Sequence, residues 1–77
     1  MDIKMADVMI HVDETLSGSR QQELVDSMRQ QKGVVAVGHH EEKSHLMVVE
    51  YNPDETDSTH LLSALKAEGV HAELIGL

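Results

Sequence analysis

The alternation of hydrophobic and polar residues predicts four strands. Between residues 6 and 12 every second residue is apolar, which is the period of a strand with one buried face. Residues 34–39 and 46–51 are short stretches rich in β-branched or apolar side chains, and the polar segment 41–44 separates them, so we expect a hairpin. Residues 70–75 alternate again and predict the last strand.

The spacing of the remaining apolar residues predicts two helices, over residues 18–31 and 58–68. A capping-box pattern begins at Ser19, so the first helix is expected to begin near Ser17 or Ser19. Asp57 is expected to cap the second helix. A glycine follows each helix at the point where a left-handed residue commonly ends one: Gly33 and Gly69.

The resulting order, βαββαβ, predicts an α+β, ferredoxin-like sandwich. Right-handed crossovers then give an antiparallel sheet of order 4-1-3-2, counting strands along the chain, with both helices on one face. Seventy-seven residues suffice for one domain and are too few for two, so we expect residues 1–77 to form a single domain.

Charge and composition exclude several classes of function. Asp and Glu number 14 against 6 Lys and Arg, a net charge of −8, which opposes binding to nucleic acid or to an anionic membrane. The chain has no cysteine, so thiolate catalysis and thiolate metal sites are excluded. No catalytic motif or cofactor fingerprint is present, and no apolar run is long enough for a membrane span. We therefore expect a cytoplasmic protein that is not an enzyme and has no resident cofactor.

The sequence resembles the heavy-metal-associated domain of copper chaperones and metal-pumping ATPases. The resemblance covers about residues 8–70 and is more specific in the second half of the chain. It depends on these residues: Gly33-Val34, Val37, Val49 to Asp54, Asp57, Leu61, Leu65 and Gly69-Val70. The family's fold is the same βαββαβ sandwich, so the resemblance implies the fold predicted above.

The resemblance also shows where this chain departs from the family. Heavy-metal-associated domains bind soft ions through Met-x-Cys-x-x-Cys, and counting back from Gly33-Val34 puts Ser17 and Arg20 at the two cysteine positions. A hydroxyl and a guanidinium cannot replace thiolates for a soft ion. We therefore do not expect this chain to bind soft ions in the way that the family does. Two roles stay open for Arg20: solvation of the first helical turn, or binding of an anion together with Ser17 and the free amides of the helix.

Six histidines offer other ligands for Zn, Ni or Cu(II). In the predicted sheet, the end of the first strand lies beside the start of the last, so His11 and His71 are expected to be neighbours on the face without helices. His40 and His45, around the hairpin, and Glu73 are expected near the same end of the sheet. A weak site built on His11 and His71 is one hypothesis, and solvated surface histidines are the other.

The same open face is expected to carry four apolar side chains on three adjacent strands: Met9, Leu46, Val48 and Ile75. A contiguous apolar patch on a sheet face commonly marks an interface, whereas isolated apolar residues are normal on a surface. A homodimer or a protein partner docked on this face is therefore expected.

Three functions remain open from the sequence. The first is a non-enzymatic interaction module that has lost its cysteine site and works by protein contact, within a metal-transport or metal-homeostasis system. The second is a metal-binding protein that uses histidines on the open face for Zn, Ni or Cu(II). The third is a small-ligand-sensing regulatory domain, which depends on analogy between folds alone.

Overall fold

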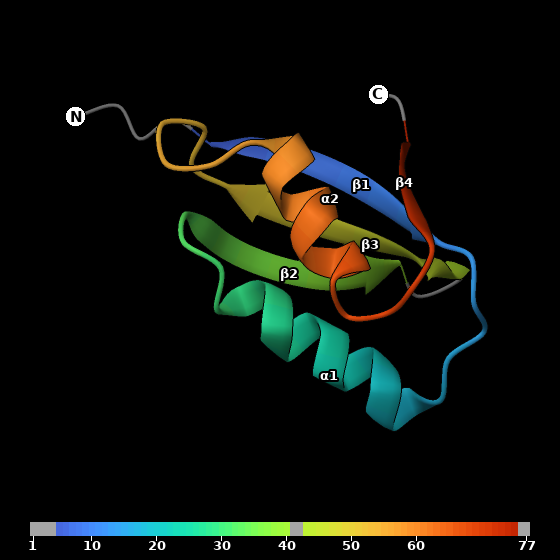
Figure 1. Ribbon diagram of the computed structural model, residues 1–77. Coiled ribbons are helices and arrows are strands. Elements are labelled where there is room, and N and C mark those ends of the chain that lie inside the picture. The colour runs from blue at the N-terminus through green and yellow to red at the C-terminus, as the bar shows by residue number, and fades with distance from the viewer. Residues whose placement is uncertain (1–4, 41–42, 76–77) are drawn as a thin grey trace.

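The computed structural model describes residues 5–40 and 43–75 of the chain (Figure 1). The order βαββαβ is confirmed. The elements are β1 Ala6–Val12, α1 Gly18–Arg29, β2 Val34–His40, β3 Lys43–Tyr51, α2 Ser58–Lys66 and β4 Ala72–Ile75. Neither helix in these residues is long and apolar enough to cross a membrane.

The four strands form one antiparallel sheet in the order β2-β3-β1-β4, so the predicted topology is confirmed. Both helices lie on the same face of the sheet (Figure 1). The central strand β1 pairs Ile10 with Met47 of β3 and Val12 with Ala72 of β4. Because side chains alternate along a strand, this register turns one set of residues toward the helices and the other toward the open face.

The core lies between the sheet and the two helices and is entirely aliphatic. Five residues from α1, β1 and β3 belong to one buried cluster: Leu24, Met28, Val8, Ile10 and Val49. Among the described residues, no polar or charged residue is fully buried. Tyr51 packs against the edge of this cluster, whose buried members are Val, Leu, Ile, Met and Ala.

The helix ends differ in detail from the prediction. Ser17 caps α1, and its hydroxyl accepts the N–H of Arg20 at 3.2 Å. The expected capping box at Ser19 is wrong, because Ser19 lies inside the first turn and Gln22 instead donates to Asp26 at 2.9 Å. Both helices also end two residues early, where tighter turns replace the helical hydrogen bonds.

Asp57 caps α2 as predicted, accepting the N–H of His60 at 2.7 Å. Gly33 and Gly69 have φ of 86° and 91°, so both adopt the predicted left-handed conformation. β4 begins at Ala72 rather than residue 70, because the backbone of His71 bonds to the loop after β1 instead of extending the strand. Part of the predicted polar hairpin tip, residues 41–42, lies outside the described residues.

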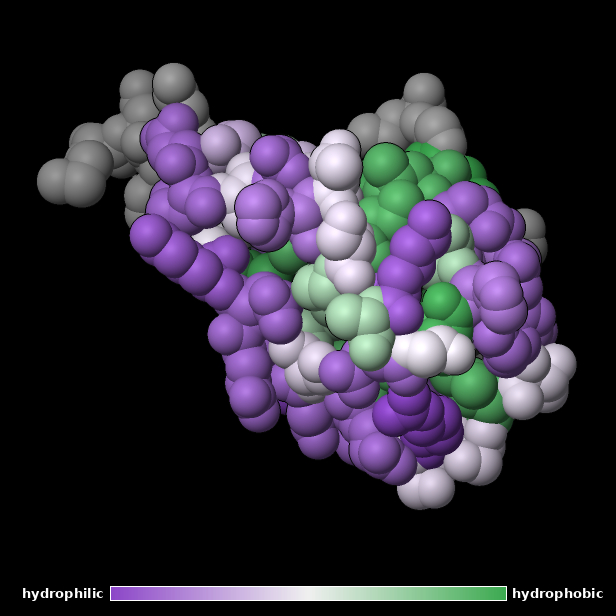
Figure 2. Space-filling model, in the orientation of Figure 1, coloured by the Kyte–Doolittle hydropathy of each residue, from purple (hydrophilic) through white to green (hydrophobic). Residues whose placement is uncertain are grey.

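Leu74 lies on the helix side of β4 but is not buried. It pairs with Ile10 of β1 but remains 38% exposed, because β4 is an edge strand and ends beyond the cover of the helices. Figure 2 shows hydrophobic surface over this strand. β4 therefore contributes exposed apolar surface on the helix side of the molecule.

Candidate functional site

Ser17 and Arg20, which stand where the resemblance puts the two cysteines, both form hydrogen bonds within the protein. The hydroxyl of Ser17 caps α1, and the guanidinium of Arg20 donates to the backbone oxygen of Glu68 and lies 3.7 Å from its carboxylate. A second carboxylate, that of Glu23, lies 3.4 Å from Arg20. Arg20 thus joins the beginning of α1 to the end of α2. This arrangement provides no donor for a soft cation, and the guanidinium already has anionic partners.

A different group of polar side chains meets where β1 ends. His11 Nδ1 lies 3.0 Å from Glu73 Oε1 and 3.1 Å from Asp13 Oδ1. The register explains the first contact, because His11 and Glu73 are cross-strand partners between β1 and β4. One ligand atom from each of the three residues lies within 4.8 Å of the others. The three side chains are 35%, 50% and 55% exposed in the order His11, Asp13, Glu73, so a cation from solvent can reach them.

His45 lies beside this group. Its ring stacks on the ring of His11 with centroids 5.6 Å apart and an interplanar angle of 19°. Its Nδ1 donates to the carbonyl oxygen of Val12 at 2.7 Å. The sequence placed His45 near this end of the sheet but did not identify Asp13 as a neighbour of His11, although the i, i+2 spacing on a strand end was a usable signal. The side chain of His40 lies outside the described part of the chain.

His71 has a separate partner. Its Nδ1 donates to Glu14 Oε2 at 2.9 Å, and its backbone N–H donates to the same carboxylate. These hydrogen bonds lower the pKa of Glu14 below its ordinary value, and the carboxylate raises the pKa of His71. His71 is joined to the His11 group through the backbone, since the N–H of Asp13 donates to the His71 oxygen at 2.8 Å. A metal site that contains both His11 and His71 stays a prediction.

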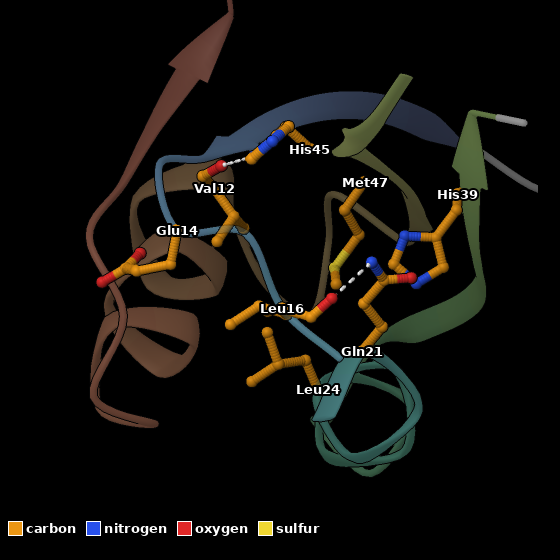
Figure 3. A pocket seen from close by; sticks show the side chains of 8 residues that line it. All are labelled: Val12, Glu14, Leu16, Gln21, Leu24, His39, His45 and Met47. Atoms are coloured by element: carbon orange, nitrogen blue, oxygen red, sulfur yellow. Dashed lines mark hydrogen bonds between the residues drawn. The ribbon is translucent and has the colours of Figure 1, made fainter. Parts of the chain in front are cut away.

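A small cavity lies on the helix side of the sheet, at the same end of the molecule (Figure 3). It has a volume of about 10 Å³, which is about the space of one water molecule. His39 and Met47, cross-strand partners on β2 and β3, point into it together. Both ring nitrogens of His39 are inaccessible to solvent and have no hydrogen-bond partner in the described structure. An unpaired buried imidazole is uncommon and destabilising.

The open face carries the four predicted apolar residues in register. Met9 pairs with Val48 on one side and Ile75 on the other, and Leu46 pairs with His11. All four side chains are partly exposed rather than fully solvated. They form a continuous row over three strands, next to the acidic pair Asp7 and Glu50.

Comparison with solved structures places this arrangement among known folds. A copper-binding domain from HMA7, a P-type ATPase, superimposes with a TM-score of 0.82 at 11% identity, covering 91% of this chain and 93% of that one. Oxidized MerP from Ralstonia metallidurans gives 0.81 at 17% identity, covering 92% and 97%. The fold is that of the heavy-metal-associated domain. The copper chaperone of Enterococcus hirae also matches, with a TM-score of 0.79 at 19% identity, covering 88% and 98%.

No family model matches this sequence, and no curated protein matches it. The likeness to heavy-metal-associated domains is therefore one of fold, at sequence identities below 20%. The departure from the family motif at Ser17 and Arg20 removes the donors for a soft ion, whereas the His11 group provides donors of another kind. The candidate metal centre of this chain is therefore at the junction of β1 and β4.

Proposed function

We propose that this chain is a non-enzymatic, single-domain metal-binding protein of the cytoplasm that has lost the cysteine site and binds a borderline divalent cation instead. His11, Asp13 and Glu73 are the ligands, and Zn(II), Ni(II) or Cu(II) is the cargo. The observation that supports this is the approach of two carboxylate oxygens to one imidazole nitrogen, at 3.0 and 3.1 Å. His11 Nδ1 carries at most one proton, so it cannot donate a full hydrogen bond to both oxygens. A cation between His11 Nδ1 and the two carboxylates attracts the nitrogen and both oxygens.

The donor set determines the class of metal. An imidazole nitrogen suits Zn, Ni and Cu(II), and two carboxylates supply the negative charge that the ion needs. The net charge of −8 further attracts cations to the surface. Because the three side chains are partly exposed, water competes for the ion, and we expect weak binding. The ion replaces the proton on His11 Nδ1, so its affinity should fall as the pH is lowered.

Isothermal titration calorimetry with Zn(II) and Ni(II) tests this function. We expect one weak site per chain in the wild type, loss of binding in His11→Ala, and unchanged binding in His60→Ala, since His60 lies on α2. Equal binding by the wild type and His11→Ala would refute the assignment. Circular dichroism of each variant verifies that the domain remains folded.

A second function is supported by the open face: contact with a protein partner, through the row of Met9, Val48 and Ile75. The acidic residues Asp7 and Glu50 border this row, and the chain as a whole is acidic, so a partner with an apolar patch flanked by basic residues fits better than a second copy of this chain. Such a partner agrees with a role in a metal-transport or metal-homeostasis system.

The matched variants for this second function are Val48→Lys and Val35→Lys. Val48 lies in the row, next to its central residue Met9, whereas Val35 is 56% exposed at a bulge of the edge strand β2. We expect Val48→Lys alone to abolish partner capture without unfolding the domain. Sedimentation of the isolated wild type should give a monomer, and a dimer that Val48→Lys dissociates would instead identify the homodimer as the occupant of the face.

A further inference from the structure

His45 differs from the other histidines in its relation to the candidate metal centre. It comes from β3, on the far side of β1 from Glu73, yet its ring lies nearly parallel to that of His11, with centroids 5.6 Å apart. The two imidazoles therefore meet at one end of the sheet. The stack places a second imidazole against His11, although His45 is not one of the three residues whose ligand atoms lie within 4.8 Å of one another. His45 is therefore a candidate for a further ligand if its ring moves toward the group.

The hydrogen bond of His45 fixes which of its nitrogens is available. A carbonyl oxygen only accepts, so the contact of 2.7 Å from His45 Nδ1 to the Val12 oxygen places the proton on Nδ1. In the neutral ring, Nε2 then carries the free lone pair. Imidazoles that bind metal ions almost always donate their other ring N–H to a carboxylate, a backbone carbonyl or water. His45 has this arrangement before any ion binds.

His71, the alternative second imidazole, also donates its Nδ1 hydrogen to an oxygen, so hydrogen bonding does not distinguish it from His45. The acceptor for His71 is Glu14, and the side chain of His71 is 84% exposed. The difference is position, because among the described residues the ring that stacks on His11 is that of His45.

We propose that His45 Nε2 completes the metal centre, together with His11 Nδ1, Asp13 and Glu73. This inference rests on the metal-binding function proposed above and extends it to a donor set of two nitrogens and two carboxylate oxygens. Two imidazoles on one tetrahedral ion have their nitrogens roughly 3.4 Å apart, from Zn–N bonds of about 2.0–2.1 Å. The two rings must therefore tilt from the observed stack as the ion binds. A set with two imidazoles favours Zn(II), Ni(II) and Cu(II) over Ca(II) and Mg(II), which prefer oxygen ligands.

Zinc titration of the full chain and of three variants tests the inference. His45→Ala removes the ring, His45→Phe keeps a flat ring against His11 but removes the nitrogen, and His71→Ala is the control. We expect both His45 variants to lose at least about tenfold in affinity, since even groups that only orient a ligand are worth 10–100-fold. His71→Ala should bind as the wild type does.

The possible results distinguish a failure of the His45 inference from a failure of the proposed metal-binding function. If His45→Phe binds zinc like the wild type while His11→Ala does not, His45 only stacks on His11, and the inference is overturned while the metal centre stands. If the wild type binds no zinc, both are overturned. A measurement on the wild type avoids any folding defect of the variants: the ¹⁵N resonance of His45 Nε2 should shift on zinc addition, and an unchanged resonance in zinc-bound protein contradicts ligation.

Discussion

Replacement of His39 by leucine should stabilise the domain. A neutral imidazole has one N–H donor and one acceptor nitrogen, and at His39 both are inaccessible to solvent without a partner. Each unpaired buried polar group costs about 1–3 kcal/mol. Leucine removes both groups and adds apolar surface beside Met47 and Leu24, which line the same cavity. Two such groups together cost about 2–6 kcal/mol. Because leucine does not reproduce the shape of the ring, imperfect packing offsets part of this cost, and we expect a net gain of about 1–3 kcal/mol.

Urea and thermal denaturation of His39→Leu measure this gain. One kcal/mol corresponds to a Tm shift of about 4–8 °C for a domain of 60–100 residues. The control is His60→Leu, at an exposed position of α2 where no buried nitrogen is relieved. A loss of stability in His39→Leu would refute the reasoning.

Three further predictions concern the fold and the lost cysteine site. Gly33→Ala should destabilise the domain by at least about 1–2 kcal/mol in urea denaturation, because φ is 86° and a Cβ would lie 3.0 Å from side chains of the turn after β3. Gly38→Ala is the control and should not destabilise the domain, because a Cβ there would meet no atom within 4 Å. The stability difference between the wild type and Glu14→Gln should be largest between the ordinary pKa values of 4.5 for Glu14 and 6.5 for His71. It should shrink as pH rises through the raised pKa of His71 or falls through the lowered pKa of Glu14. The purified protein should not retain Cu(I) against a thiol chelator, because Arg20 offers no soft ligand; tight stoichiometric Cu(I) binding contradicts this.

The strand pattern and turn residues were enough to predict the topology. The alternation in residues 6–12 gave β1 with its observed bounds, and the glycines after both helices gave the two left-handed positions. These features are local, since a period of two and a positive φ depend on residues close together in the sequence. The order of the sheet then followed from the handedness of the connections.

The candidate site was only partly predictable, because it depends on register and side-chain direction. The sequence placed His11 and Glu73 at one end of the sheet, but the cross-strand pairing that brings them into contact depends on where β4 begins. The shifts of register in β2 were not visible in the sequence, and neither was the burial of the two ring nitrogens of His39. The stack of His45 on His11 depends on the twist of the sheet, which no residue pattern specifies.

The most direct test of the metal centre is the ¹H–¹⁵N spectrum of the wild-type protein titrated with Zn(II) at neutral pH. We predict that the signals of His11, Asp13 and Glu73 shift together and saturate with one equivalent bound, while the signal of His60 on α2 does not move. A spectrum in which these three signals stay unchanged in excess zinc, or in which only residues elsewhere shift, would contradict the account.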